Sequence, residues 1–236
     1  MAADFAPETV RQGLERSFVE TNPSSDFVPP VYSLARGARV RRLLSDAFGD
    51  RLIEQLPRRF FCLSCDLAAR EAVVHRLGPL VDALYPSLAI PGVFPPVSTG
   101  DGRLLVDGGV IDNLPVARMA QRAEGPVVAV DVTARPGLLR PPASGQFELA
   151  GRRLRRALTR TDADLPRLAE TIIGAITVGS SDTALAARLN ADLVITPAVD
   201  GIGVTEWRAL PRARELGRQA ARQALAAHPG FVAAAT

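Results

Sequence analysis

The amino-acid sequence predicts an α/β fold of three layers, α/β/α, with a mostly parallel central sheet. One observation is the continuous apolar run at residues 126–132, which is bounded by turn formers and is typical of a strand covered on both faces. The other is the alternation of strand-like and helix-like segments from residue 58 onward, which predicts crossover units. The 236 residues have the length of one domain, and no linker is rich enough in Pro or Gly to divide them.

Two helices are predicted in the N-terminal part of the chain. Apolar residues recur near helical spacing over residues 8–20, and a cluster of turn formers follows at residues 22–26. A second helix is predicted over residues 32–48 and ends at Gly49. Its arginines are typical of a solvated face, and they are Arg36, Arg39, Arg41 and Arg42.

A β-hairpin is predicted from residues 58–67 and 72–75, followed by a short helix over residues 78–88. We interpret His75, at the end of the second strand, as a packed residue rather than a catalytic group. Cys62 and Cys65 have a spacing that also occurs in redox and zinc sites. No second cysteine pair accompanies them, and a strand points them to opposite faces, so we interpret both as buried structural residues.

The rest of the chain is organised around residues 86–117. The apolar run at residues 104–106 has the length of a strand and stops abruptly at Asp107, which two glycines follow. Gly108 and Gly109 permit positive φ and allow another backbone or a substrate to approach closely. We therefore expect the Asp107 carboxylate at an open site. Asp-Gly pairs also form plain turns, and these three residues alone leave that alternative open.

After Pro115, helix and strand predictions alternate to the end of the chain. Helices are predicted over residues 115–122, 165–178, 183–190 and 210–227, and strands over residues 126–132 and 191–197. Residues 135–148 are rich in Pro and predict a mobile loop. A basic segment follows this loop. Whether it faces solvent or contacts an anionic membrane surface stays open.

Composition excludes several classes of protein. All 28 basic residues are Arg, which indicates a bias toward GC-rich codons, and a net charge of +3 is too small to favour nucleic-acid binding. No apolar run has the roughly 20 residues of a membrane-spanning helix, and the N-terminus lacks a signal pattern. We expect a cytoplasmic protein, with peripheral membrane contact as a further hypothesis.

The order of motifs in residues 86–117 resembles a known family. A Pro-rich segment at residues 86–96 precedes the strand that ends in Asp107-Gly108-Gly109, and Asp112-Asn113-Leu114-Pro115 then opens a helix. This series is similar to the second catalytic block of patatin-like phospholipases, most closely the bacterial branch that is like neuropathy target esterase. The resemblance implies that Asp107 is the general base, that Gly108 and Gly109 form its turn and that Asn113 supports it. It covers about residues 8–228, so we expect 1–236 to be one partial, N-terminally truncated patatin-like domain.

The nucleophile that this family uses is missing from the sequence. Patatin-like hydrolases carry a Ser in a Gly-x-Ser-x-Gly elbow, with a Gly-rich loop that binds the oxyanion. Here the segment around Ser181 differs in spacing, and Ser98-Thr99-Gly100 lacks the first Gly. We expect an upstream segment to supply the Ser, and without it we expect an exposed sheet edge, an apolar face and marginal stability.

Two functions follow from the resemblance. The first is the C-terminal part of a lipid acyl hydrolase that acts on phospholipid or lysophospholipid through a Ser–Asp dyad, without a cofactor or metal. The second is an inactive remnant, or a regulatory module that binds lipid surfaces, and the absent Ser favours it.

Overall fold

The computed structural model describes residues 5–16, 26, 33–122, 124–133, 172, 174–176, 179, 181–203 and 206–234. The loop predicted at 135–148, the basic segment after it and most of the helix predicted at 165–178 lie outside these residues. The longer helices are α1 (Pro7–Leu14), α2 (Ala38–Phe48), α3 (Leu80–Ser87), α4 (Val116–Ala120), α7 (Ser181–Leu189), α8 (Leu210–Ala227) and α9 (Pro229–Ala234). The strands are β1 (Cys62–Asp66), β2 (Glu71–His75), β3 (Val97–Ser98), β4 (Leu104–Asp107), β5 (Val128–Val130) and β6 (Leu193–Ile195), and single 3₁₀ turns occur at Ile53–Gln55, Gly108–Val110 and Trp207–Ala209.

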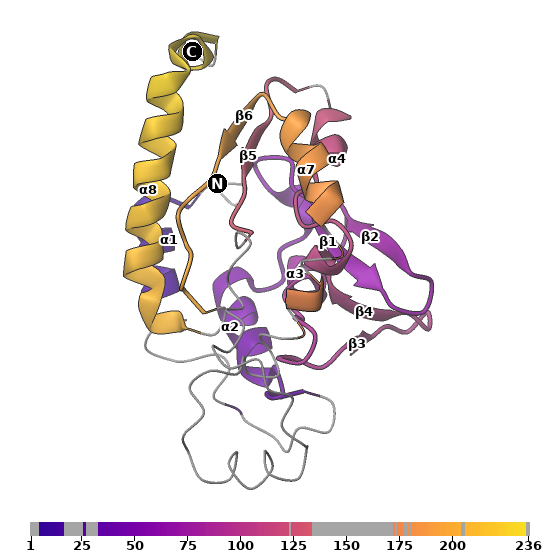
Figure 1. Cartoon of the computed structure of the whole chain (residues 1–236). Coiled ribbons are helices and arrows are strands. Elements are labelled where there is room, and N and C mark those ends of the chain that lie inside the picture. The colour runs from indigo at the N-terminus through magenta and orange to yellow at the C-terminus, as the bar shows by residue number, and fades with distance from the viewer. Residues whose placement is uncertain are drawn as a thin grey trace, which may run out of the picture.

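The predicted α/β class is confirmed, and Figure 1 shows how the helices and strands are arranged. The described strands form two groups, a four-stranded sheet in the order β2-β1-β4-β3 and the pair β5-β6. β5 and β6 are parallel, as predicted, but the three pairings of the larger sheet are antiparallel. The expectation of a mostly parallel sheet therefore holds for β5 and β6 and does not hold for the larger sheet. For β1 and β2 the physical reason is the length of the connection, because the short turn between them allows only antiparallel pairing.

Helices cover the larger sheet on the face where α3 lies. α3 packs on β1 and β4, and α2 packs on α3. Ile53, Leu80 and Ala83 form the buried cluster between this helix and the strands. α3 is also tied to β4 through the backbone, because the Asp107 N–H donates to the Ala89 carbonyl at 3.0 Å. This bond fixes the end of β4, where the predicted site lies.

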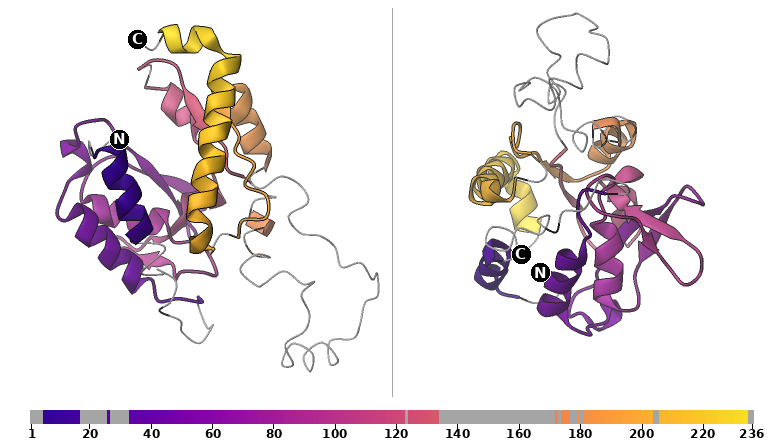
Figure 2. Two further views of the ribbon diagram at one scale, coloured as in Figure 1. Left: turned by 90° about the vertical axis from the view of Figure 1, so that its left-hand side faces the viewer. Right: turned by 90° about the horizontal axis from the view of Figure 1, so that it is seen from below.

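The second pair of strands lies between helices. Figures 1 and 2 show α8 beside β6, which it contacts, and α4 and α7 on the other side of the strand pair, which agrees with the expected three layers. Val116, Val127 and Ala129 are buried between α4, β5 and α7. An ion pair adds to this packing, because Arg188 of α7 donates to Asp131, which is only 2% exposed at the end of β5.

The other face of β5 is not covered as the sequence suggested. Val128, Val130 and Val132 are 44%, 52% and 58% exposed, so the prediction that both faces of residues 126–132 are buried was wrong. Among the described strands β5 pairs only with β6. The expected exposed apolar face is thus present, and it lies on β5.

α1 covers the first part of the helix predicted over 8–20, and residues 17–20 of that prediction lie outside the described part of the chain. The other helix and strand predictions agree with the described structure to within a few residues, with one clear exception. The helix predicted over 32–48 begins only at Ala38, because Leu34 and Ala35 instead donate backbone hydrogen bonds to Gly92 and Val93. Its arginines are all exposed, as predicted. The short strand β3 was not predicted, since two residues carry no periodic pattern.

Gly108 generates a prediction about stability, because the 3₁₀ turn Gly108–Val110 packs directly on β1. A Cβ on Gly108 would lie 2.5 Å from the Leu63 carbonyl oxygen. We expect Gly108→Ala to lower the free energy of unfolding by about 1–3 kcal/mol, the usual cost of overpacking. Gly217→Ala in α8 is the control, since nothing lies within 4 Å of its added methyl group, and Ala raises helix stability by about 0.8–1 kcal/mol over Gly. Urea unfolding of both variants checks this, and equal stabilities would contradict it.

Candidate active site

Asp107 stands at the end of β4 in a geometry that fixes its carboxylate. Its Oδ1 accepts a hydrogen bond of 2.7 Å from the Gly109 backbone N–H, so the side chain caps the turn that follows it. Across the sheet Asp107 lies opposite Ser64 of β1. The sheet thus holds the backbone of Asp107, and the turn that follows holds its carboxylate.

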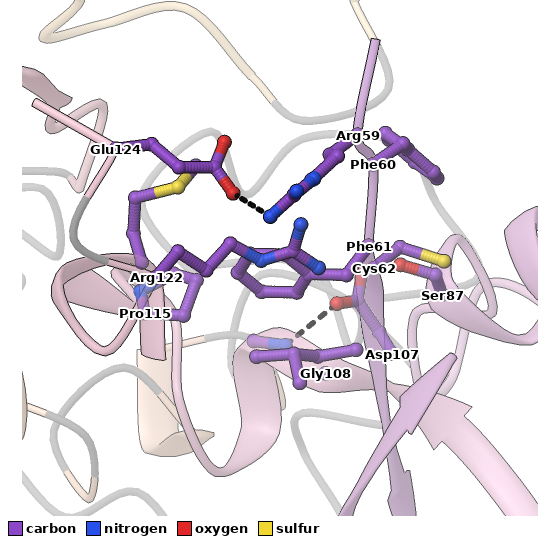
Figure 3. A pocket seen from close by; sticks show the side chains of 13 residues that line it. Arg59, Phe60, Phe61, Cys62, Ser87, Asp107, Gly108, Pro115, Arg122 and Glu124 are labelled. Atoms are coloured by element: carbon purple, nitrogen blue, oxygen red, sulfur yellow. Dashed lines mark hydrogen bonds and ion pairs between the residues drawn. The ribbon is translucent and has the colours of Figure 1, made fainter. Parts of the chain in front are cut away.

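A pocket of about 410 Å³ opens beside this carboxylate. Figure 3 shows the residues around it, which come from β1 and the segment before it, from the end of α3, from β4 and its turn, and from α4 and the segment after it. Most of the lining is apolar, and the charged groups are few. The lining residues that the argument uses are Phe60, Phe61, Met119, Asp107, Arg122, Arg59 and Glu124. A largely apolar pocket with a few fixed polar groups is typical of a small-molecule site.

Burial changes the acidity of Asp107. Removal from water raises the pKa of this carboxyl above its ordinary value, and the hydrogen bond from the Gly109 N–H opposes that shift in part. A carboxylate with a raised pKa is a stronger base than an exposed one. Asp107 can therefore accept a proton from a hydroxyl group better than an ordinary surface Asp.

The two glycines after Asp107 have a steric role rather than the conformational one that was predicted. Neither Gly108 nor Gly109 has a positive φ. The predicted close approach is present, because Gly108 touches the Leu63 backbone and a Cβ on Gly109 would lie 3.0 Å from Asn113 Oδ1. Any larger residue would push the turn away from β1 or from Asn113.

Asn113 joins this turn to the end of β5. Its Nδ2 donates to Thr133 Oγ1 at 3.1 Å, and the Thr133 N–H in turn donates to Asp131 Oδ1 at 2.8 Å. Asn113 is exposed and does not line the pocket. Of the four residues that the resemblance implies, Asp107, Gly108 and Gly109 thus line the pocket, and Asn113 lies outside its lining.

The cysteines differ from each other in their surroundings. Cys65 is buried, as predicted. Cys62 is only partly buried and lines the pocket, where its Sγ lies 3.4 Å from the Ala83 carbonyl oxygen. Burial raises the pKa of the Cys62 thiol to about 11, although a hydrogen bond with Ser87 acts in the opposite direction. Cys62 is therefore protonated at neutral pH and a poor nucleophile.

His75 lies on β2, as predicted, and outside the pocket lining. Its Nε2 is hydrogen-bonded to Ser64 Oγ at 2.7 Å, and Ser64 is fully buried. Burial, and to a lesser degree the charge of Arg103, lower the pKa of His75, so the ring is neutral at pH 7. The hydrogen bond with His75 thus satisfies the buried hydroxyl of Ser64, the residue that lies opposite Asp107 across the sheet.

Sequence reasoning missed most of the pocket wall. Phe60, Phe61 and Met119 lie in segments whose periodicity predicts only strand or helix. The adjacent aromatic pair just before β1 was a signal, but only the fold brings it against Asp107. Arg122, two residues after α4, had no signal at all.

Comparison with known proteins decides the family. A model of the patatin-like phospholipase family matches residues 17–120, which include Asp107, Gly108, Gly109 and Asn113. An NTE family protein of Mycobacterium tuberculosis, described as uncharacterized, is 38% identical over 228 residues. The chain is similar to the patatin-like phospholipase family. Its relatives place it in the branch that includes neuropathy target esterase, and the fold and motif order agree with that family.

The matched lengths differ strongly between relatives. The alignment with the mycobacterial protein covers 92% of this chain and 37% of the relative, so the chain spans little more than a third of that protein. A lysophospholipase of Candida glabrata is 35% identical over 108 residues, which are 46% of this chain and 6% of the relative. The Drosophila melanogaster protein named neuropathy target esterase sws is 33% identical over 108 residues, 45% of this chain and 8% of its own.

None of the helices in the described residues combines the length and the hydropathy that crossing a bilayer requires.

The burial of Asp107 predicts a pH-dependent effect on stability. Because the folded-state pKa is raised, the folded protein holds the proton more tightly than the unfolded chain, and stability falls as pH rises from the ordinary pKa of 3.8 through the raised value. We expect Asp107→Asn to raise the melting temperature at pH 7, because the amide removes a buried charge. The gain should shrink as pH falls toward 4.

Melting curves of the wild type and the variant between pH 4 and 8 measure this difference. Asp46→Asn on the exposed side of α2 is the control and should show no such trend. A variant that melts below the wild type at pH 7 would contradict the proposed burial of a charged carboxylate.

Proposed function

We propose that this chain supplies the carboxylate of a Ser–Asp acyl hydrolase that cleaves carboxylic esters of phospholipid or lysophospholipid. The observation that carries the proposal is Asp107, a partly buried carboxylate that the Gly109 N–H holds at the wall of a largely apolar pocket. Such a pocket suits an acyl chain, and its low polarity makes the carboxylate a better base. The names of the relatives, a lysophospholipase and an esterase, support the same reaction class.

In the proposed reaction Asp107 acts first as base and then as acid. It takes the proton from the Ser hydroxyl while the Ser oxygen attacks the ester carbonyl carbon, and it returns that proton to the leaving alcohol as the acyl-enzyme forms. Water then attacks the acyl-enzyme, with Asp107 again holding the proton, and the fatty acid and free Ser are released. Asn113 supports this step indirectly, by holding the turn of Gly109 against Thr133.

We infer that the Ser and its oxyanion-binding N–H groups lie on a segment outside these 236 residues. The sequence contains no Gly-x-Ser-x-Gly, and the exposed Val128, Val130 and Val132 offer an apolar face for such a segment. On this view residues 1–236 are one partial patatin-like domain. We also propose that the protein is cytoplasmic and contacts membranes peripherally. Its net charge of +3 supports the membrane contact.

Ester turnover tests the role of Asp107. We expect protein extended through the reading frame upstream of Met1 to hydrolyse a short-chain nitrophenyl ester, and Asp107→Asn to lower kcat by about 10³-fold or more, as for other catalytic bases. Asp46→Asn should leave the rate unchanged. An unchanged rate in Asp107→Asn would remove this residue from the mechanism.

A fluorophosphonate probe separates the proposal from its alternatives. Labelling should require the upstream segment, so a Ser of the 236-residue chain that reacts by itself would refute an external nucleophile. Liposome co-sedimentation without labelling or turnover in the extended protein would instead favour the lipid-binding module that lacks catalysis.

A further inference from the structure

The pocket beside Asp107 contains a positive charge that the proposed reaction does not use. Four charged side chains line it, and two of these neutralise each other, because Arg59 donates to Glu124 at 2.6 Å across the rim. Arg122 and Asp107 are the other two, and no ion pair joins Arg122 to a carboxylate within the described part of the chain. The pocket thus contains one cation and one anion that form no ion pair with each other.

Packing fixes the position of the Arg122 guanidinium. Its Cζ lies 5.2 Å from the centroid of the Phe61 ring, and Figure 3 shows the guanidinium over that ring. The Nε atom is buried and has no hydrogen-bond partner among the described residues. The side chain is therefore held in the pocket by an aromatic contact that provides no hydrogen-bond acceptor.

A guanidinium in this state has unused binding capacity. It carries five N–H donors in a planar fork, and donors left unpaired where water is limited cost free energy. Because the Nε is covered by protein, a ligand would meet the terminal Nη groups. Phosphate and carboxylate oxygens fit this fork and form hydrogen bonds stronger than those between neutral groups.

We propose that Arg122 is the specificity-determining residue of this pocket and binds the phosphate or carboxylate of an acyl ligand. The apolar side chains of Phe60 and Met119 would hold the acyl chain, and repulsion from Asp107 would keep the anionic group at the Arg122 wall. The ester would then lie between the two charged groups. This inference deepens the proposed function and rests on it for the identity of the ligand as an ester.

Binding measurements test the proposal without requiring turnover. Calorimetric titration of the protein compares hexanoyl lysophosphatidate with monohexanoylglycerol, which has the same acyl chain and no phosphate. We expect the anionic ligand to bind about tenfold or more tightly, the usual gain from a charge-assisted hydrogen bond. Arg122→Gln should abolish this preference, and Arg122→Lys should retain only part of it.

Arg118→Gln is the matched control, because Arg118 lies on α4 just before Arg122 in the chain, pairs with Asp112 and does not line the pocket. It should keep the full preference. Melting curves of both glutamine variants show whether each is folded. A folded Arg122→Gln protein that still prefers the anionic ligand, or a wild type without any preference, would overturn the proposal.

A titration with inorganic phosphate, the third ligand, tests whether the anion that Arg122 binds belongs to an acyl ligand or is free phosphate. Weak binding of phosphate alone supports an acyl ligand, and binding as tight as that of lysophosphatidate would overturn the acyl assignment. The two proposals also fail separately. Absent ester turnover with the preference intact refutes the hydrolase, whereas turnover that needs Asp107 without any preference refutes only the role of Arg122.

Discussion

The site depends on one hydrogen bond, from the Gly109 N–H to the Asp107 carboxylate. This bond holds the side chain in a single orientation at the point where β4 ends. The turn that makes this bond packs closely on β1, because Gly108 has no Cβ that would collide with the Leu63 backbone. The absence of a side chain at residue 108 therefore determines where the carboxylate lies, and the burial that follows raises its pKa.

The pocket combines two charges in a mostly apolar wall. Asp107 is a base and Arg122 is a cation, and aromatic and aliphatic side chains line the pocket around them. An apolar surrounding strengthens both electrostatic effects, because there is less water to screen them. A ligand with an acyl chain and an anionic group would satisfy all three features together, which is why the two proposals concern one substrate.

The arrangement of the strands has a consequence for the whole fold. The larger sheet and the β5-β6 pair are linked by the Asn113–Thr133 hydrogen bond and by helix packing, while two valines of β5 and Val132 just after it remain exposed. An exposed row of β-branched residues beside a strand edge favours association with another segment. The segment that we propose to carry the Ser would cover this face.

The sequence by itself determined the α/β class, most of the helices and strands, and Asp107 with its two glycines. These features are local, since apolar periodicity and a carboxylate before Gly-Gly are legible within ten residues. It did not determine the antiparallel order of β2-β1-β4-β3, the exposed face of β5 or the steric role of Gly108. Those depend on which segments meet in space, as do the approach of Phe61 to Arg122 and the pocket that both share with Asp107, because contacts between residues sixty positions apart leave no periodic mark in the chain.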